Sequence, residues 1–229
     1  MAKQRQQDSG AENKARIVIV DDHPIVQQGL KELINQENDL VVCGQAEDAY
    51  QAMKVIRELE PDMAIVDISL KEVSGVELIK DIKLQYPNLP ILTLSMHDEF
   101  LYAERALRAG AKGYIMKQQA TSNVIAAIRK ILNGELYLSE KIAAKMVDKY
   151  VGNRPVIGAS PIECLSDREL EVFLLIGNGF GTRQIAGQLH LSVKTIETYR
   201  AHIKEKLNLA SAAELLQYAI QWVSSRDKS

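Results

Sequence analysis

The 229-residue sequence lacks the features of a membrane or exported protein. No apolar run approaches the roughly 20 residues that a membrane-spanning helix needs. The N-terminal stretch MAKQRQQDSGAENKAR is polar throughout and has no apolar core of the kind found in secretion signals. We therefore expect a cytoplasmic protein that makes no contact with a membrane.

The sequence also has few cysteines and no net positive charge. The two cysteines, Cys43 and Cys164, lie far apart and match neither the ligand spacing of a zinc site nor a disulfide framework. We expect both to be reduced. The formal net charge is −2, so a surface that binds nucleic acid would have to be a local one.

Apolar residues, by contrast, are abundant and follow two patterns between residues 15 and 133. Short apolar runs occur at RIVIV, LVVCG, MAIVDI, ILTLS and GYIM, and the stretches between them carry apolar residues at helical spacing. Strands that alternate with helices are typical of a doubly wound α/β domain. We therefore predict a five-stranded parallel sheet with the flavodoxin-like strand order 2-1-3-4-5.

The remaining sequence is helical. SEKIAAKMVDKY predicts one helix, VGNRPVIGASPIE has the Gly, Pro and Ser content of a linker, and four amphipathic segments follow with no strand between them. Ser166 with Glu169, and Ser211 with Glu214, have the spacing of capping boxes at helix starts. We divide the chain into a polar extension (1–14), an α/β domain (15–135), a helical segment with a linker (136–161) and a small all-α domain (162–229).

Polar residues mark the ends of the predicted strands. Asp21 and Asp22 follow the first strand in IVIVDDHP, Asp67 and Ser95 end the third and fourth, and Lys117 follows the fifth. The carboxyl ends of parallel strands meet at one edge of the sheet, where ligands bind. Three carboxylates there would repel one another unless a cation were present, and an all-oxygen ligand set suits Mg²⁺.

These residue types suit phosphoryl transfer. A carboxylate can act as nucleophile, Mg²⁺ and Lys117 can neutralise the phosphoryl group, and Ser95 can bond one of its oxygens. Each residue also has an ordinary structural reading: Asp22 or Asp67 as a cap, Ser95 bonded to its own backbone, Lys117 solvated. Four unrelated structural roles at four strand ends would be a coincidence, so the pattern favours a single phosphoryl site.

The all-α domain contains a helix-turn-helix pattern, GTRQIAGQLHLSVKTIETYRAHIKEKL, with its turn near residues 190–192. Between residues 183 and 206, five basic residues face two acidic ones, a net charge of +3. Ser192 should cap the second helix, whose core face carries Ile196, Ile203 and Leu207. The expected DNA-contacting residues are Arg183, Ser192, Lys194, Thr195, Glu197, Thr198, Arg200, Ala201 and Lys204.

Glu197 is the exception among these contacts because it would repel phosphate. It could accept a hydrogen bond from a cytosine amino group, or pair with Arg200 and orient that residue. A single motif covers a small stretch of DNA, so we expect a homodimer that reads two half-sites.

The strand-end motifs VDDHP, VDIS, LS and GYIMK resemble the CheY-like receiver domain of two-component response regulators, and the helical region resembles the LuxR-type domain of the NarL/FixJ subfamily. The resemblance implies that Asp67 accepts a phosphoryl group from a sensor histidine kinase. It implies that Mg²⁺ is held by Asp21, Asp22, Asp67 and the backbone carbonyl of Ser69, that Ser95 and Lys117 bind the phosphoryl group, and that Ser95 and Tyr114 form the switch.

The sequence departs from the receiver pattern at two positions, with Lys71 four residues after Asp67 and Gln118 after Lys117, where proline is frequent. Ser69 and His97 stand where receivers tune the phosphoryl lifetime. We expect a DNA-binding transcriptional response regulator that catalyses nothing beyond its own phosphorylation and dephosphorylation. The alternatives are a phosphorylation-independent DNA binder and an Asp-nucleophile phosphohydrolase, although DDHP lacks the aspartate spacing of haloacid dehalogenases.

Overall fold

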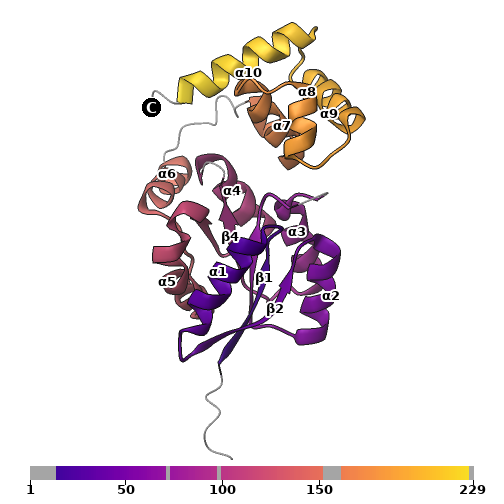
Figure 1. Cartoon of the computed structure of the whole chain (residues 1–229). Helices are drawn as coiled ribbons and strands as arrows, with labels where there is room; N and C mark the ends of the chain where they lie inside the picture. Colours follow the sequence, from indigo (N-terminus) through magenta and orange to yellow (C-terminus); the bar gives the residue numbers. More distant parts are fainter. Residues whose placement is uncertain (1–13, 71–72, 97–98, 152–160, 227–229) are drawn as a thin grey trace, which may run out of the picture. The chain divides into compact units, whose positions relative to one another are not determined.

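The structure is a computed structural model that describes residues 14–70, 73–96, 99–151 and 161–226. Lys71, His97 and most of the expected linker therefore lie outside the described residues. The chain forms two compact units, with the main division between Ile142 and Ala143. Figure 1 shows the helices and strands of each unit.

The first unit is built on a parallel sheet of five strands in the order β2-β1-β3-β4-β5, which confirms the expected fold. The strands are β1 (Ala15–Val20), β2 (Leu40–Ala46), β3 (Met63–Asp67), β4 (Ile91–Ser95) and β5 (Gly113–Met116). Every residue of β3 and β4 is buried. Strands covered on both faces tolerate no polar alternation, which is why these segments read as continuous apolar runs.

Helices connect the strands and cover both faces of the sheet (Figure 1). They are α1 (Pro24–Asn35), α2 (Ala49–Leu59), α3 (Gly75–Gln85), α4 (Glu99–Ala109) and α5 (Ala120–Leu132). On one face, α1 and α5 pack against the strands through fully buried side chains such as Ile34 and Ile128. This packing holds the carboxyl ends of the strands, and hence the predicted site, in fixed positions.

The backbone after α5 returns to the sheet and lies along β5. Tyr137 donates its N–H to the carbonyl of Lys112 at 2.9 Å and accepts from Tyr114 N–H at 3.0 Å, forming a parallel bridge with Gly113. A Cβ at Gly113 would lie 2.9 Å from the Tyr137 carbonyl oxygen, so glycine is needed for this close approach. Helix α6 (Glu140–Val151) follows, as predicted.

The second unit is all-helical and contains α7 (Asp167–Gly177), α8 (Thr182–Gln188), α9 (Val193–Lys206) and α10 (Ala212–Arg226), after a short 3₁₀ turn, η2 (Pro161–Cys164). The four predicted helices are confirmed. Phe173 of α7 packs against the rings of Tyr218 and Trp222 of α10, with centroids 5.9 Å apart in both pairs. In the described part of the chain, no helix is both long and apolar enough to span a bilayer.

The two expected capping boxes have different outcomes. At α7, Ser166 accepts from Glu169 N–H at 3.4 Å, and the Glu169 carboxylate accepts from Ser166 N–H at 2.7 Å, so this box is complete. At α10, Ser211 accepts from Glu214 N–H at 3.1 Å, but Glu214 accepts from Ala210 N–H at 2.9 Å. The capping box predicted at α10 is therefore only half formed. Ser211 makes the expected hydrogen bond, but the Glu214 side chain accepts from Ala210 N–H instead of Ser211 N–H.

Candidate functional site

The structure brings the predicted strand-end residues together at one edge of the first unit. Asp21 and Asp22 follow β1, which pairs with β3, and β3 ends at Asp67. Asp21 and Asp67 are each 1% exposed, and Ser95, the last residue of β4, is fully buried. The strand order alone places these side chains side by side, as the sequence predicted.

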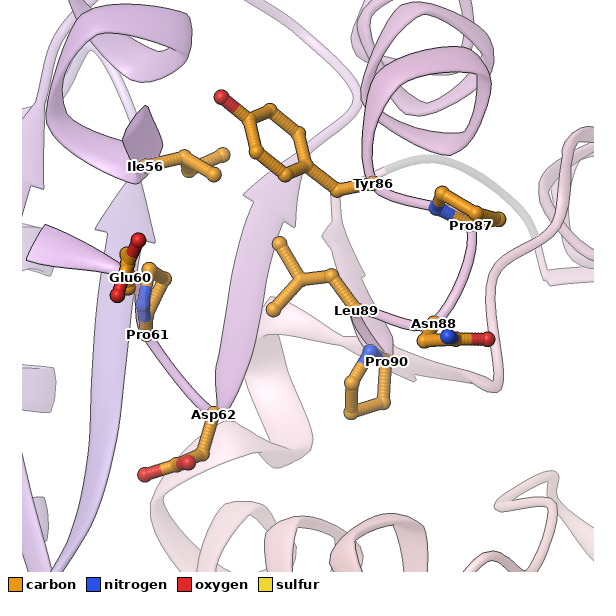
Figure 2. Close-up of a pocket in the computed structure, with 9 residues that line it drawn as sticks. All are labelled: Ile56, Glu60, Pro61, Asp62, Tyr86, Pro87, Asn88, Leu89 and Pro90. Atoms are coloured by element: carbon orange, nitrogen blue, oxygen red, sulfur yellow. The ribbon is translucent and has the colours of Figure 1, made fainter. Parts of the chain in front are cut away.

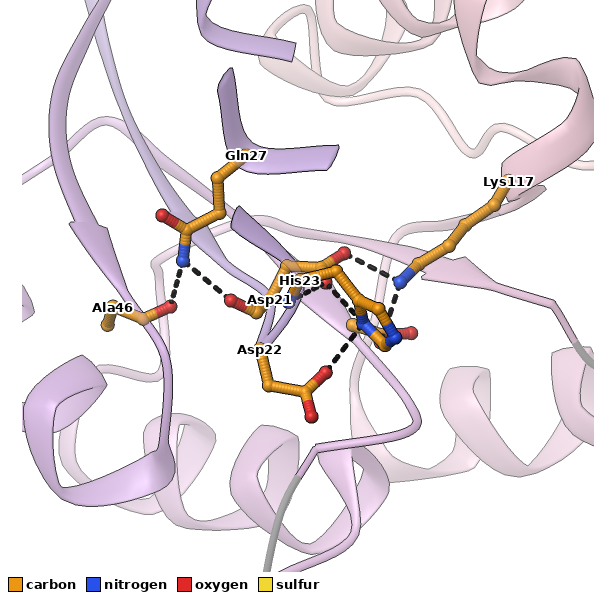
Figure 3. A network of polar contacts seen from close by, with 7 residues as sticks. Asp21, Asp22, His23, Gln27, Ala46 and Lys117 are labelled. Atoms are coloured by element: carbon orange, nitrogen blue, oxygen red, sulfur yellow. Dashed lines mark hydrogen bonds and ion pairs between the residues drawn. The ribbon is translucent and has the colours of Figure 1, made fainter. Parts of the chain in front are cut away.

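Lys117, which directly follows the edge strand β5, completes the cluster. Its Nζ lies 2.7 Å from Asp21 Oδ2 and 2.8 Å from Asp67 Oδ2, and its side chain is 8% exposed (Figure 3). Lys117 begins the short helix η1 (Lys117–Gln119), in which Gln118 is exposed. Although Gln118 rather than proline follows Lys117, the ammonium group of Lys117 is directed at the carboxylates of Asp21 and Asp67.

Burial and neighbouring charges act in opposite directions on the pKa values of this cluster. Burial and the neighbouring Asp21 raise the pKa of Asp67, and the attraction of Lys117 does not offset them because one ammonium group is shared between two carboxylates. At Lys117 the balance is reversed. Burial alone would lower the pKa of Lys117, but the charges and hydrogen bonds of Asp67 and Asp21 raise it above its ordinary value.

The pocket has the donor set of a hard divalent cation. Asp67 Oδ1 is buried and has no hydrogen-bond partner among the described residues. Ligand atoms of Asp21, Asp22, His23 and Asp67 all lie within 4.8 Å of one another. Unpaired carboxylate oxygens in a buried site are costly, and an oxygen-binding cation such as Mg²⁺ would satisfy them.

The alternative in which Asp22 caps the first helix is wrong. The residue before α1 is His23, whose side chain makes no capping hydrogen bond, and Pro24 is the first helical residue. The carboxylate of Asp21 accepts from His23 N–H at 2.9 Å, and Asp22 Oδ1 lies 2.7 Å from His23 Nδ1. Both carboxylates are therefore directed into the pocket rather than toward the helix terminus.

Two neighbouring residues were not identified from the sequence. Gln27 on α1 is 7% exposed and donates from Nε2 to the carbonyls of Asp21, at 2.6 Å, and Ala46, at 2.8 Å (Figure 3). It thereby fixes the loop that carries the aspartates. The second is His23, and its signal in the sequence was its position directly after the two aspartates.

The structure places Ser69 and Tyr114 near the strand ends. Ser69 is half-buried, two residues beyond Asp67. Tyr114 is 1% exposed in β5, where it pairs in register with Thr93 of β4. The expected switch residues thus lie on neighbouring strands.

In the second unit, α8 and α9 form the expected helix-turn-helix. His190, in the turn, adopts a left-handed backbone conformation with φ of 54°. Ser192 caps α9 by accepting from Thr195 N–H at 3.0 Å, as predicted. Ile196 and Ile203 are fully buried, and Leu207 is half-buried just after the helix. The core face of α9 therefore agrees with the sequence analysis.

The opposite side of this motif carries the expected DNA contacts. Exposed there are Arg183, Ser192, Lys194, Glu197, Thr198 and Ala201, whereas Thr195, Arg200 and Lys204 are half-buried. The Thr198 hydroxyl donates to the carbonyl of Lys194 at 3.1 Å, and Ser192 shares a 2.7 Å hydrogen bond with Thr195. Among the described residues, no ion pair joins Glu197 to Arg200, so the suggestion that Glu197 orients Arg200 gains no support.

The far end of α9 is anchored to α7. Lys206 Nζ lies 2.6 Å from Glu169 Oε2, the same carboxylate that completes the capping box of α7. His202 Nδ1 lies 3.8 Å from the other Glu169 oxygen. Burial would raise the pKa of Glu169, but the hydrogen bonds from Lys206 and Ser166 exceed that effect and lower it. This carboxylate sets where α9 sits relative to the rest of its unit.

A separate cavity of about 490 Å³ lies at the opposite end of the sheet, beside the residues that precede β3 and β4 (Figure 2). Tyr86 and Leu89 point toward Ile56 within it. It is lined by Ile56, Glu60, Pro61, Asp62, Tyr86, Pro87, Asn88, Leu89 and Pro90. None of the carboxylates described above contributes to it, so it plays no part in the candidate site.

A buried acidic pocket at the carboxyl edge of such a sheet, on a chain that also carries a helix-turn-helix, defines a signal-receiving regulator. Comparison with known families agrees. The response regulator receiver domain matches residues 17–129, and the family described as bacterial regulatory proteins, luxR family, matches residues 163–219. The chain belongs to the response regulators that join a receiver domain to a LuxR-type helix-turn-helix DNA-binding domain.

Individual relatives support this assignment over nearly the whole chain. The oxygen regulatory protein NreC of Staphylococcus carnosus (strain TM300) is 37% identical over 210 residues, which cover 90% of this chain and 97% of that protein. NreC of Staphylococcus aureus (strain JH9) is 38% identical with the same coverage.

Solved structures of related regulators share the fold. The RcsB response regulator of Salmonella typhimurium matches with a TM-score of 0.62 at 27% identity, covering 91% of this chain and 98% of that one. RcsB of Salmonella enterica serovar Typhimurium, bound to promoter rprA in the presence of the phosphomimetic BeF₃⁻, gives 0.58 at 28% identity, covering 90% and 98%. A LuxR-family response regulator from Aurantimonas sp. SI85-9A1 gives 0.56 at 35% identity, covering 60% and 99%.

Proposed function

We propose that Asp67 is the phosphoacceptor of this regulator and that a sensor histidine kinase, or a small donor such as acetyl phosphate, phosphorylates it. One observation carries the proposal: Asp67 is a buried carboxylate with one oxygen bound to Lys117, and its other oxygen has no hydrogen-bond partner in the described part of the chain. An oxygen held in this way is oriented by its neighbour and can still act as a nucleophile.

The proposed reaction needs few groups. An oxygen of Asp67 attacks the phosphorus atom, the bond from phosphorus to the donor breaks, and the imidazole of the kinase histidine or the acetate of acetyl phosphate leaves. Lys117 balances the charge on the phosphoryl oxygens, and the Ser95 hydroxyl donates to one of them. Mg²⁺, held by Asp21, Asp22, Asp67 and the backbone carbonyl of Ser69, would add charge neutralisation at the same oxygens.

Intact mass spectrometry tests this proposal. After incubation with acetyl phosphate and Mg²⁺, the wild-type chain should gain one phosphoryl group, and chelation of the metal should prevent the gain. Asp67→Asn should not be labelled. The control is Asp62→Asn, which changes an aspartate at the other end of β3 and should be labelled like the wild type. Labelling of Asp67→Asn to the wild-type level would refute the assignment.

Phosphorylation would act through charge. The new group brings about −1.5 to −2 charges into the pocket and draws Ser95 and Lys117 toward it. Tyr114 would move with them and shift a pre-existing equilibrium toward a homodimer that binds two DNA half-sites. The related structures of RcsB dimers bound to DNA, and of RcsB bound to a promoter in the presence of a phosphomimetic, support this proposal.

DNA binding provides the second test. A fragment selected from a random pool by the beryllofluoride-treated protein should bind that form at least tenfold more tightly than the untreated form, measured by fluorescence anisotropy. The increase should disappear in Asp67→Asn. Equal affinity of the treated and untreated wild type would favour the phosphorylation-independent DNA binder.

The proposed contact surface of the second unit comprises Arg183, Ser192, Lys194, Thr195, Glu197, Thr198, Arg200, Ala201 and Lys204. Lys194 is exposed near the start of α9 and suits a phosphate contact. Lys194→Ala should lower the slope of log affinity against log salt concentration by about one per half-site. Lys54→Ala, an exposed lysine of α2, should leave the slope unchanged. A slope unchanged by Lys194→Ala would remove Lys194 from the contact surface.

The same proposal assigns residues 15–135 to the receiver, 136–161 to a helical segment and linker, and 162–229 to the DNA-binding domain, in a cytoplasmic protein. The receiver would catalyse only its own phosphorylation and dephosphorylation. Incubation with phosphate monoesters such as p-nitrophenyl phosphate should therefore give no turnover above that of Asp67→Asn. Multiple turnovers that depend on Asp67 would instead favour a phosphohydrolase.

A further inference from the structure

The imidazole of His23 faces the carboxylates of the acidic pocket. Its Nδ1 lies 2.7 Å from Asp22 Oδ1 and 3.2 Å from Asp21 Oδ1, and Figure 3 shows the ring directed at both. The side chain of His23 is 60% exposed, so an incoming ion can reach it. As the residue preceding α1 it makes no capping hydrogen bond, so its ring has no role in starting the helix.

The distances can be compared with those between neighbouring ligands of one ion. Neighbouring ligands of a tetrahedral Zn²⁺, each about 2.0–2.1 Å from the ion, lie about 3.3–3.4 Å apart. The 3.2 Å from His23 Nδ1 to Asp21 Oδ1 is close to that value, and the 2.7 Å to Asp22 Oδ1 would have to widen as the ion enters between the two atoms. Asp67 Oδ1, which is buried and has no hydrogen-bond partner within the ranges that the structure describes, belongs to the same group of atoms within 4.8 Å.

The nitrogen changes which ions the pocket prefers. Mg²⁺ favours oxygen ligands only, whereas imidazole favours the later first-row ions, Zn²⁺ among them. Three carboxylates and an imidazole form a mixed nitrogen and oxygen set that fits the usual ligands of Zn²⁺. A pocket with carboxylates alone would lack this preference.

We propose that His23 Nδ1 is a metal ligand through which the acidic pocket binds Zn²⁺ in competition with Mg²⁺. The inference rests on the proposed function in one respect, namely that these carboxylates hold the Mg²⁺ needed for phosphorylation. Binding of Zn²⁺ with His23 as a ligand would displace Mg²⁺ from the same carboxylates. The availability of Zn²⁺ would then influence how much receiver is competent for phosphorylation.

Isothermal titration calorimetry on the full chain tests the proposal. The metal-free wild type, His23→Gln and His202→Gln are each titrated with ZnCl₂ and, separately, with MgCl₂. The Kd for Zn²⁺ should rise at least tenfold in His23→Gln, while the Kd for Mg²⁺ changes less than threefold. His202→Gln removes an exposed imidazole of α9 and should change neither constant.

A spectroscopic measurement separates a ligand from a positioning contact. X-ray absorption of the Zn²⁺-loaded wild type should show imidazole scattering that is lost in His23→Gln. An unchanged Kd for Zn²⁺ in His23→Gln, an equal loss for both ions, or no imidazole in the wild-type spectrum would overturn the proposal.

A negative result for Zn²⁺ binding can be told apart from a failure of the proposed phosphorylation of Asp67. Labelling of the wild type by acetyl phosphate, with Mg²⁺ and without Zn²⁺, tests the phosphoacceptor assignment by itself. If the wild type neither bound Mg²⁺ nor became labelled, the phosphoacceptor assignment would fail whatever the result with Zn²⁺.

Discussion

Asp67 carries its charge in a place where burial opposes it. Burial, with help from Asp21, raises the pKa of Asp67 above its ordinary value of 3.8 in spite of Lys117. The folded state therefore holds the proton more tightly than the unfolded state does. The stability that Asp67 contributes through this raised pKa is complete below its ordinary pKa of 3.8. It is lost as the pH rises through the pKa of Asp67 in the folded state.

The raised pKa of Asp67 leads to a prediction about Asp67→Asn, whose side chain has no charge at any pH. Without divalent cations, the free energy of unfolding of the variant relative to the wild type should increase as the pH is raised from 4 to 7. Urea unfolding followed by circular dichroism measures the difference. Saturating Mg²⁺ should reduce it at pH 7 because the ion stabilises only the charged pocket. A difference that shrank with rising pH in metal-free buffer would contradict the prediction.

Gln27 is the second residue whose role is testable. Gln27→Ala removes the donor to the carbonyls of Asp21 and Ala46 and leaves both without this partner. The free energy of unfolding should fall by about 1–3 kcal/mol. Labelling by acetyl phosphate should slow as well, because the loop that carries the aspartates loses its anchor. Gln28→Ala, an exposed neighbour, should change stability by less than about 0.5 kcal/mol. Equal effects of the two variants would exclude the anchoring role.

Residues differed in how far they could be predicted from sequence. Asp21, Asp67 and Lys117 were predictable because parallel strands end at a common edge, and strand ends are visible in the apolar runs. Gln27 was not predictable, since a glutamine in an amphipathic helix reads as solvent-facing until packing buries it. The contacts of His23 were hidden for a related reason: they depend on the extended backbone that His23 adopts before Pro24.

At the scale of elements, the position of α9 depends on a carboxylate of α7. Glu169 both completes the cap of α7 and binds Lys206 at the end of α9. The sequence indicated the cap, because the spacing of Ser166 and Glu169 is local. It did not indicate the contact with Lys206, which requires the tertiary packing of α7 against α9.

Glu169→Gln should therefore weaken both contacts. The free energy of unfolding of the second unit should fall by about 1 kcal/mol, as for loss of a helix cap. Fluorescence of Trp222, the only tryptophan, reports this unit in the full chain. Because the pKa of Glu169 is lowered, its contribution is present above the ordinary value of 4.5 and is lost as the pH falls through the folded-state pKa. The loss caused by the variant should diminish in acid.

Glu163→Gln is the control for charge, since Glu163 is an exposed acidic residue in η2 of the same unit. It should leave the Trp222 transition in place. If it lowered stability as much as Glu169→Gln does, the effect would come from net charge and not from the anchoring of α9.

At the scale of the whole molecule, the chain divides into two compact units. The proposed ligands, Mg²⁺ and a phosphoryl analogue, bind only the first unit. A ligand at one hundred times its Kd stabilises the unit that binds it by about 2.7 kcal/mol. Beryllofluoride with Mg²⁺ should therefore shift part of the urea transition seen by circular dichroism, while the transition seen by Trp222 fluorescence stays where it was. A parallel shift of both would show that the two units unfold as one.

The bridge between Tyr137 and Gly113 bears on how the exposed edge of the sheet is kept from pairing with a strand of another molecule. β5 lies at one edge of the sheet, where unpaired backbone groups can recruit a strand from another molecule. Here the chain's own backbone occupies hydrogen-bonding positions along that edge. A fragment cut after residue 135 would keep all five strands and helix α5 but expose this part of β5. The segment that leads out of the receiver thus also protects it, and a safe boundary for an isolated receiver lies beyond Tyr137.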